Sequence, residues 1–449
     1  KPRFPSAQDK YSSTVLFRHG TALVQHSIQP RPVLPASTTR SPQLRYSLQC
    51  CIVMALGGLF GTAAVAVVVS LAVHVALNCP IQPLPSPRPP PPAARYRPNN
   101  LLQGLEKLGE GQLSAPEDVY VDAAAGGTLY TATRDGWLQR MHPNGSWEQW
   151  RFVGGTGLLG IAPSADGSVL VCDADKGLLR VEEGRVTILA STVEGSTIRF
   201  ADEAIEASDG TVYFSDASTR FGFDRWFHAY VESQPTGRLL KYDPRTGKAS
   251  VALDNLSFAN GVALSRDEAF VIVCETGRFK CTRLWLKGDK TGQAETFVGD
   301  LPGSPDNIQL APDGSFWIAL IQVTSLHLSS PTWIPYQLNH TLGCSICVQR
   351  SPWLDLVMRW TFTKRVVASF PALLDAVHAT GKGAMVAQVS EDGEVLRVLD
   401  DTEGKVINFI TSVTEFNGDL FFGSLATNFV GKLSLAKVAQ AQEQAAASS

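Results

Sequence analysis

The sequence predicts an all-β protein, a six-bladed β-propeller that follows an N-terminal hydrophobic anchor or signal helix. Three observations carry this prediction. A turn followed by an apolar strand recurs six times along the chain, almost no helical periodicity is visible among these repeats, and one long uncharged segment precedes them.

The uncharged segment lies between Arg45 and Arg88, where no Asp, Glu, Lys or Arg occurs. Residues 50–77 within it exceed the roughly 20 apolar residues that a membrane-spanning helix needs. A buried core helix is the alternative, but the absence of charge and the many Val and Ala residues favour a membrane segment. We therefore expect a transmembrane or signal-anchor helix at residues 54–78, and the sequence leaves open whether it is cleaved.

The segments on either side of this helix have no periodicity of their own. Residues 1–53 contain no methionine before Met54, and we expect them to be a disordered or non-native extension, which N-terminal sequencing of the native protein would test. Residues 79–100 are rich in proline, so we expect an extended linker without a core.

The repeated unit is a turn of the Asp-Gly type followed by an alternating or β-branched apolar strand, and after most copies a second strand completes a hairpin. The six copies are Gly126-Gly127 before TLYTAT, Asp166-Gly167 before SVLVCDA, Asp209-Gly210 before TVYFSDA, Arg266-Asp267 before AFVIVCE, Asp313-Gly314 before SFWIAL and Asn417-Gly418 before DLFFGSL. The first five copies lie about 40 to 58 residues apart, the period of four-stranded propeller blades. We therefore expect one propeller over residues 101–437 and a flexible tail at 438–449, either a frayed helix or disorder.

The interval between the fifth and sixth copies is much longer than the others. Residues 323–348 within it contain no Asp, Glu, Lys or Arg and no blade pattern, so we expect an insertion, either a retained intron or a lid loop. Without this segment, ALIQ before it and RSPWLDLVMRWTFTKR after it would join naturally.

Eight cysteines are too few for a disulfide-built scaffold of 449 residues, so the fold must rest on a hydrophobic core. The single CxxC motif, Cys344 to Cys347, has no second pair with which to form a zinc site. Cys274 and Cys281 lie on two strand-like segments joined by a turn, where either a cross-strand disulfide or two buried thiols would fit.

Polar residues stand immediately before or at the start of apolar strands in several repeats. They are Glu117, Asp202, Asn260, Asp306 and Asn307. The inner strands of a propeller converge on one channel, so these side chains are expected to meet there. Asp and Asn also cap strand entries as ordinary turn residues, but their repetition in register with the blades favours a Ca²⁺ site, because Ca²⁺ binds six to eight oxygen ligands.

The linked phrases RFADEAIEASDGTVYFSDASTRF, TGRLLKYDP, LSFANGVALSRDEAFVIVCET and LPGSPDNI resemble the strictosidine synthase-like family of plants, which also includes the animal adipocyte plasma membrane-associated protein. The resemblance covers about residues 105–435 apart from the expected insertion. It implies a six-bladed propeller in the secretory pathway, more distantly related to the calcium-dependent paraoxonase and gluconolactonase hydrolases.

In those hydrolases the metal polarises an ester or lactone carbonyl, and the resemblance places metal ligands on Glu117, Asn260 and Asp306, with Asn307 beside them. Asp306 is then the candidate ligand and catalytic base. Relatives commonly read FANDL where this chain reads FADEA, and we expect Ala201 to replace an Asn ligand. An alanine cannot coordinate a metal, so this change either weakens the calcium site or leaves the work of the ligand to Asp202 and water. His228 and His378 are expected to be loop or surface groups.

True strictosidine synthases condense an amine with an aldehyde without metal, and use a glutamate near the last blade as general base. The resemblance places Thr411 at that position, and a threonine at its ordinary pKa is a poor base. We therefore expect a metal-dependent ester or lactone hydrolase. The alternatives are a strictosidine synthase-type condensing enzyme and a non-catalytic binding propeller, which Ala201 and the absence of a histidine pair favour.

The remaining features concern the partners and the compartment of the protein. With 39 basic and 42 acidic residues, the chain lacks the basic field of a nucleic-acid-binding protein, so the expected partners are a small-molecule substrate and a membrane contacted through the N-terminal helix. Asn144, Asn255 and Asn339 begin glycosylation sequons. These features predict a membrane-anchored or lumenal glycoprotein of the endoplasmic reticulum or vacuole.

Overall fold

The computed structural model describes residues 42–85, 98–323, 352–379, 381 and 383–447. The chain divides into two compact units, Lys1–Val68 and Val69–Ser449. The described part of the first unit belongs to helix α1 (Pro42–Asn78), which begins earlier than the predicted residue 54 and extends into the second unit. Residues 60–78 of this helix are long and apolar enough to cross a membrane.

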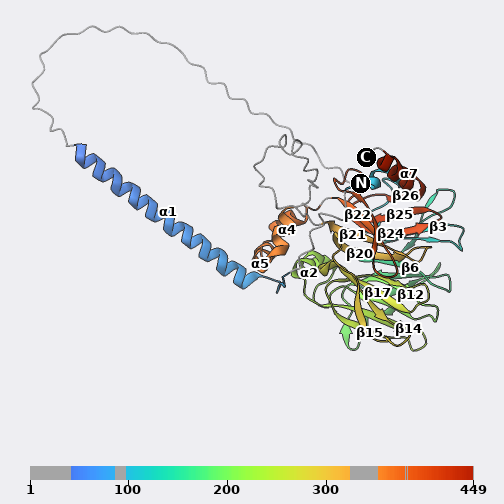
Figure 1. Ribbon diagram of the computed structural model, residues 1–449. Helices are drawn as coiled ribbons and strands as arrows, with labels where there is room; N and C mark the ends of the chain where they lie inside the picture. The colour runs from blue at the N-terminus through green and yellow to red at the C-terminus, as the bar shows by residue number, and fades with distance from the viewer. Residues whose placement is uncertain (1–41, 86–97, 324–351, 380, 382, 448–449) are drawn as a thin grey trace, which may run out of the picture. The chain divides into compact units, whose positions relative to one another are not determined.

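The second unit contains six four-stranded antiparallel sheets, as the repeats predict (Figure 1). The first three are β2 (Val119–Asp122), β3 (Thr128–Ala132), β4 (Trp137–Met141) and β5 (Trp147–Phe152); β6 (Leu158–Pro163), β7 (Val169–Asp173), β8 (Gly177–Val181) and β9 (Val186–Ala190); and β12 (Ala201–Glu206), β13 (Val212–Asp216), β14 (Gly237–Asp243) and β15 (Lys248–Leu256). The next two are β16 (Ala259–Leu264), β17 (Phe270–Glu275), β18 (Lys280–Trp285) and β19 (Ala294–Val298); and β20 (Gly303–Leu310), β21 (Phe316–Val323), β22 (Ala384–Val389) and β23 (Val395–Asp401).

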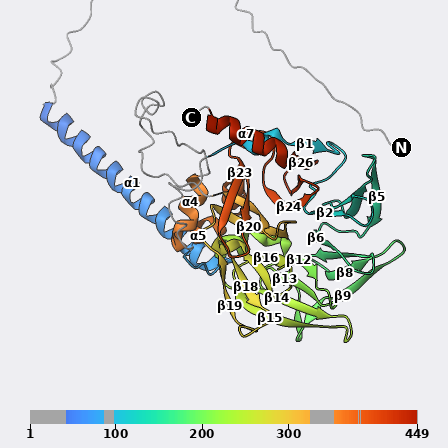
Figure 2. The same cartoon turned by 45° about the vertical axis from the view of Figure 1, so that its right-hand side comes forward.

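The sixth sheet joins the two ends of the propeller. It runs β24 (Ile410–Phe416), β25 (Asp419–Ser424), β26 (Val430–Ser434) and then β1 (Glu106–Leu108), which pairs antiparallel with β26. The first strands of successive sheets contact one another in the order β2, β6, β12, β16, β20 and β24, and β24 contacts β2. The ring of blades seen in Figure 2 is therefore closed, and the N-terminal strand forms the outer edge of the last blade.

The predicted turns are present and repeat the same local bonding. Asp166, Asp209 and Asp313 each accept a hydrogen bond from the backbone N–H two residues later, which is how Asp stabilises a turn. The following glycines, Gly167, Gly210 and Gly314, have positive φ, a conformation that glycine adopts without a steric cost.

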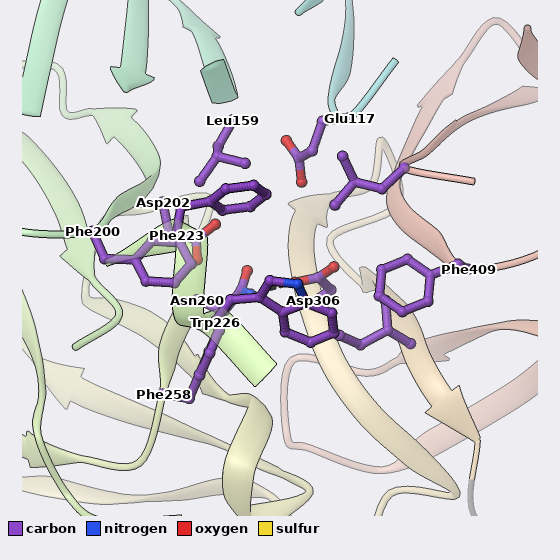
Figure 3. Close-up of a pocket in the computed structure, with 12 residues that line it drawn as sticks. Glu117, Leu159, Phe200, Asp202, Phe223, Trp226, Phe258, Asn260, Asp306 and Phe409 are labelled. Carbon is purple, nitrogen blue, oxygen red and sulfur yellow. Dashed lines mark hydrogen bonds between the residues drawn. The ribbon is translucent and has the colours of Figure 1, made fainter. Parts of the chain in front are cut away.

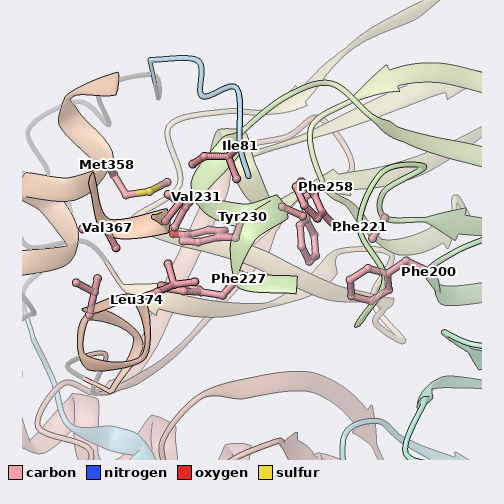
Figure 4. Close-up of a cluster of buried hydrophobic side chains, with 14 of the residues drawn as sticks. Ile81, Phe200, Phe221, Phe227, Tyr230, Val231, Phe258, Met358, Val367 and Leu374 are labelled. Carbon is pink, nitrogen blue, oxygen red and sulfur yellow. The ribbon is translucent and has the colours of Figure 1, made fainter. Parts of the chain in front are cut away.

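The small elements lie in the segments that connect the strands or precede the first of them. They are the 3₁₀ turns η1 (Leu101–Gly104), η2 (Phe223–Arg225) and η3 (Thr276–Arg278), the two-stranded ribbon β10 (Thr192–Val193) and β11 (Ser196–Thr197), and the helix α2 (Trp226–Glu232). Helix α2 follows β13 and buries Phe227, Tyr230 and Val231 in an apolar cluster that also contains Ile81 (Figure 4).

Three helices occupy part of the long interval in the fifth blade, between β21 and β22. They are α4 (Pro352–Arg359), α5 (Thr361–Ala368) and α6 (Pro371–His378), and we call them the helical cap. The segment RSPWLDLVMRWTFTKR does not extend the sheet of the fifth blade after ALIQ, because it forms α4 and part of α5, and its apolar residues Val357 and Met358 pack in the cluster around α2. The expected insertion at 323–348 lies outside the described residues, apart from Val323, the last residue of β21.

Two further boundaries differ from the prediction. The described ends of the predicted linker are packed on the domain: Ile81 is only 3% exposed, and the backbone N–H groups of Asn99 and Asn100 donate to the carboxylate of Asp400. The tail forms helix α7 (Leu435–Ala447), and Val438 is buried in the core. Contacts with the propeller hold both segments in place: apolar contacts at Ile81 and Val438, and hydrogen bonds at Asn99 and Asn100.

Candidate functional site

The five predicted metal ligands are brought together at the centre of the ring. Asp202 lies on β12, Asn260 on β16, and Asp306 and Asn307 on β20, while Glu117 stands two residues before β2. All five side chains are buried, and four of them (Glu117, Asp202, Asn260 and Asp306) line one small cavity of about 30 Å³ (Figure 3). Such a volume has room for a water-sized body or a single ion.

A β-bulge recurs at the same point of four inner strands and orients the side chains of the site. The pairing register shifts between Leu158 and Ile161 in β6, and the equivalent shifts occur at residues 201–204 in β12, 259–262 in β16 and 305–308 in β20. A bulge adds a residue and re-aims side chains, so the consecutive Asp306 and Asn307 can both contribute to the site.

Gly261 shows why the bulge in β16 requires glycine. A Cβ atom at this position would lie 2.4 Å from the backbone oxygen of Asp306 and 2.6 Å from the nitrogen of Ile308. The close approach of β16 to β20 therefore depends on the missing side chain. The ANG and PDN phrases of the sequence are adjacent in space for this reason.

Hydrogen bonds link the polar residues in two pairs. The Asn260 amide donates to Oδ1 of Asp306, and the Asn307 amide donates to Oε1 of Glu117 over 3.3 Å. Three buried oxygens of the predicted ligands have no hydrogen-bond partner among the described residues: Oε2 of Glu117, Oδ1 of Asn260 and Oδ1 of Asn307. Each is a free acceptor, which is costly to leave buried and unsatisfied.

The carboxyl groups of the site repel one another in a dry environment. Burial, and then the neighbouring carboxylates, raise the pKa of Glu117 well above its usual value, and the same causes raise the pKa of Asp202 and Asp306. Arg134 opposes the shift at Glu117 and Asp202. Arg134 therefore offsets only part of the repulsion between these carboxyl groups.

Two further buried acids, Asp118 and Glu203, lie next to the predicted ligands, and sequence reasoning did not single them out. Oδ1 and Oδ2 of Asp118 accept from the backbone N–H groups of Val119 and Ile161 at 2.7 and 2.8 Å, and Glu203 Oε1 accepts from Ala204 at 3.0 Å. Burial raises the pKa of both groups. The signal that could have revealed them is the pair of consecutive acids in PEDVYV and FADEA.

The expectation for Ala201 is wrong. Phe200 and Asp202 line the cavity, whereas Ala201 is fully buried in an apolar cluster between blades, with Leu170, Cys172 and Phe214. Side chains alternate along a strand, so position 201 points away from the channel. Ala201 therefore does not occupy a ligand position, because the side chain that reaches the cavity from this strand is that of Asp202.

Thr411 is also buried, and its hydroxyl donates to the backbone oxygen of Glu117 over 2.6 Å. This bond ties β24 to the segment that carries Glu117. Thr411 is not among the residues that line the cavity, whereas Phe409, two residues earlier, is. Thr411 thus helps to hold a site residue in place.

A larger outer cavity of about 470 Å³ adjoins the inner one. The two share Phe223, Trp226, Phe409 and Leu425 as lining residues, so these apolar side chains stand where the inner and outer cavities meet. The outer cavity is completed by Arg134 and His378 among others. An apolar cavity with a few polar groups is typical of small-molecule sites.

Two polar groups of the outer cavity, Arg134 and His378, contact aromatic rings. The Arg134 guanidinium lies 3.9 Å from the centroid of the Phe223 ring and donates to the backbone oxygen of Leu158 over 3.1 Å. His378 is exposed, as expected, but it ends helix α6 and contacts the ring of Trp226 at a centroid distance of 5.1 Å. His228 lies on α2 beside Phe221 and does not line either cavity.

A cation would fit the inner cavity only with help from the asparagines. Among the described residues, no group of three or more His, Cys, Asp or Glu side chains is placed to hold a metal ion. The three unpartnered oxygens come from one carboxylate and two amides, which are oxygen donors of the kind that Ca²⁺ binds. The donor chemistry therefore fits a hard cation.

The remaining predicted sites are placed as follows. Cys274 and Cys281 stand opposite each other on β17 and β18 and form a disulfide. Asn144 and Asn255 are exposed, so their sequons are accessible, and glycosylation stays a prediction. Asn339 and the CxxC motif lie outside the described residues.

Comparison with known proteins decides the family. Residues 202–289 match the strictosidine synthase family model, and residues 94–141 match the model of the strictosidine synthase-like N-terminal region. The chain is 31% identical over 363 residues to Protein STRICTOSIDINE SYNTHASE-LIKE 4 of Arabidopsis thaliana, covering 78% of this chain and 87% of the relative. The chain belongs to the strictosidine synthase-like family.

The strictosidine synthase-like relatives include animal proteins. The adipocyte plasma membrane-associated protein of Salmo salar is 30% identical over 390 residues, which cover 82% of this chain and 87% of that protein. Among solved structures, a gluconolactonase of Xanthomonas campestris is similar at 14% identity with a TM-score of 0.49, covering 75% of this chain and 91% of the other.

Proposed function

We propose that this strictosidine synthase-like propeller is a Ca²⁺-dependent hydrolase of esters or lactones, with its reaction site at the inner cavity. The observation that carries the proposal is the set of three buried, unpartnered oxygens on Glu117, Asn260 and Asn307. Unsatisfied acceptors are rare in native interiors. Here they gather beside carboxyls whose mutual repulsion a cation would relieve.

The residues that would hold the ion are Glu117, Asn260, Asp306 and Asn307, with Asp202 at the same cavity. A bound Ca²⁺ would supply Lewis-acid polarisation of the substrate carbonyl. Asn260 donates to Asp306 and so fixes the orientation of its carboxylate. We assign to Asp306 the role of ligand and proton acceptor, because it lines the cavity and a positioned carboxylate can remove a proton from an attacking water.

The outer cavity indicates the shape of the substrate. Its walls are largely aromatic or aliphatic, with Phe223, Trp226 and Phe409 at the boundary to the inner cavity. Such walls would exclude water and bind a bulky apolar group of an ester or lactone. Arg134 and His378 would contact a polar substituent of that group.

The proposed setting is the secretory pathway, in the endoplasmic reticulum or vacuole. The cross-strand disulfide is of a kind that persists in oxidising compartments. The exposed sequons and the apolar helix α1 agree with a lumenal glycoprotein that is membrane-anchored or released.

Asp306→Asn tests this function. Ca²⁺ is expected to raise the unfolding temperature of the full chain, because a ligand at about 100 times its Kd adds roughly 2.7 kcal/mol of stability. Asp306→Asn keeps the acceptor for Asn260 but removes a charge. It should leave the metal-free protein at least as stable, abolish most of the calcium shift, and lower aryl-ester turnover about 10²-fold or more.

Asp166→Asn is the matched control, since Asp166 is a turn carboxylate far along the blade and Asn preserves its bond to Ser168. It should retain both the calcium shift and turnover. A well-folded wild-type protein without any calcium shift would contradict the proposal. Amine-aldehyde condensation would then indicate a synthase, and the absence of both activities a binding propeller.

A further inference from the structure

The outer side of the helical cap, α4–α6, is unusually apolar for a surface. Leu356, Trp360, Phe362 and Leu373 are 43%, 57%, 71% and 41% exposed. The opposite side of the same helices is buried. It packs into the cluster around α2 through Val357, Met358, Val367 and Leu374 (Figure 4). The cap therefore has two apolar sides, one of them without a partner in the described part of the chain.

The end of helix α1 contacts this cap within the second unit of the chain. His74 stacks on Phe370 with ring centroids 4.6 Å apart, and its Nε2 lies 3.2 Å from the backbone oxygen of Ser369. Both contacted residues lie between α5 and α6. The last turn of the helix that is apolar enough to cross a membrane is thus attached to the cap.

The chain beyond α1 is fixed to the cap after only three more residues. Ile81 is 3% exposed in the same cluster as Val357 and Val367. Lys364 of α5 then donates to the backbone oxygen of Leu84 over 2.7 Å. Three residues span at most about 10 Å, so the cap must stay next to the point where α1 ends.

The charges of the cap suit a lipid surface. Arg359 ends α4 and Arg365 lies on α5, and both are exposed, while α6 carries the exposed acid Asp375, so cations exceed acids among the exposed side chains that the structure describes there. Arginine beside exposed aromatic residues is typical of helices that lie in the interface between lipid headgroups and acyl chains. A second protein would also cover an apolar face, but the short connection to α1 favours the bilayer.

We propose that the outer side of the helical cap rests on the surface of the bilayer that α1 enters, with Trp360 and Phe362 inserted among the lipids. His378 ends the cap and lines the outer cavity. If the proposed hydrolase function holds, the substrate therefore enters the outer cavity from the interfacial layer of the membrane. The docking itself does not depend on that function.

The test uses full-length protein in phosphatidylcholine–phosphatidylserine vesicles whose acyl chains carry bromine, which quenches nearby tryptophan. The chain has nine tryptophans, so Trp360→Phe is compared with Trp147→Phe, which removes a half-buried tryptophan of β5. Trp360→Phe should remove a lipid-quenched component of the emission that Trp147→Phe leaves in place. Both changes are conservative, and thermal unfolding confirms that the variants are folded.

Aqueous iodide distinguishes the other outcomes. Loss of an iodide-quenched component in Trp360→Phe would place Trp360 in water and overturn the proposal. If neither bromine nor iodide quenches the emission of Trp360, protein covers the cap. This result would also overturn the proposal. Because fluorescence needs no turnover, a failed hydrolase assay leaves this test unaffected.

Discussion

Glu117, Asp202 and Asp306 are acids that the fold holds together away from water, and this arrangement links calcium to pH. Burial and mutual repulsion raise the pKa of each carboxyl. In the unfolded chain the same groups ionise near pH 4. A raised folded pKa stabilises the metal-free protein at low pH, and this stability is lost as the pH rises from about 4 through the folded pKa values.

Calcium should therefore stabilise the protein more at pH 8 than at pH 5, because the ion binds ionised carboxylates and competes with their protons. Thermal unfolding with and without Ca²⁺ at the two pH values measures the difference. Asp306→Asn lacks one of the groups and should show a smaller dependence. Equal calcium shifts at both pH values in the wild-type protein would contradict this account.

At the scale of single elements, the bulges in four inner strands orient the side chains of the site. The strands paired with these inner strands hold them in position. The disulfide between Cys274 and Cys281 joins directly opposite residues of β17 and β18 in a buried cluster that also contains Ile308 of β20. It thus stabilises the blade next to the strand that carries Asp306.

Replacing both Cys274 and Cys281 by alanine should lower the free energy of unfolding by about 2 kcal/mol, since the closed loop is short. Denaturant unfolding measures the loss. A reductant should lower the midpoint of the wild-type protein and leave that of the double variant unchanged. A reductant effect of equal size in both proteins would show that this bond is not its target.

At the scale of the whole molecule, the ring is closed by residues from its two ends. β1 pairs with β26, Asp400 accepts from the backbone of Asn99 and Asn100, and Leu102 is fully buried in the cluster between the fifth and sixth blades. All six blades must be in place for the inner strands to meet, so the site depends on this closure.

Leu102→Ala should lower the free energy of unfolding by about 2 to 5 kcal/mol, because it leaves a cavity at the closure. Leu396→Ala is the control, since Leu396 is 55% exposed on β23 and its loss should cost within about 0.5 kcal/mol. Denaturant unfolding compares the two variants. A similar small cost for both would mean that Leu102 does not hold the ring together.

The sequence by itself determined the propeller, its six repeats and the residues that approach the channel. Turn residues and alternating strands are local signals, and they recur with the period of a blade. It also located the apolar helix and the two half-cystines, although it left the disulfide and a pair of thiols as equal alternatives. Only the pairing of β17 with β18 placed these sulfurs together.

Tertiary structure alone decided where the inner strands bulge and where the helical cap packs. A one-residue change in strand phase moves a side chain to the other face. Aligned letter by letter, FANDL and FADEA put Asp202, not Ala201, at the Asn position, and Asp202 is the residue that lines the cavity. The bulges that set this phase, and the packing of α4–α6 on α2, depend on contacts between distant segments. Such contacts leave no periodic trace in the sequence, which is why the helical cap and the place of His378 at the cavity were not predicted.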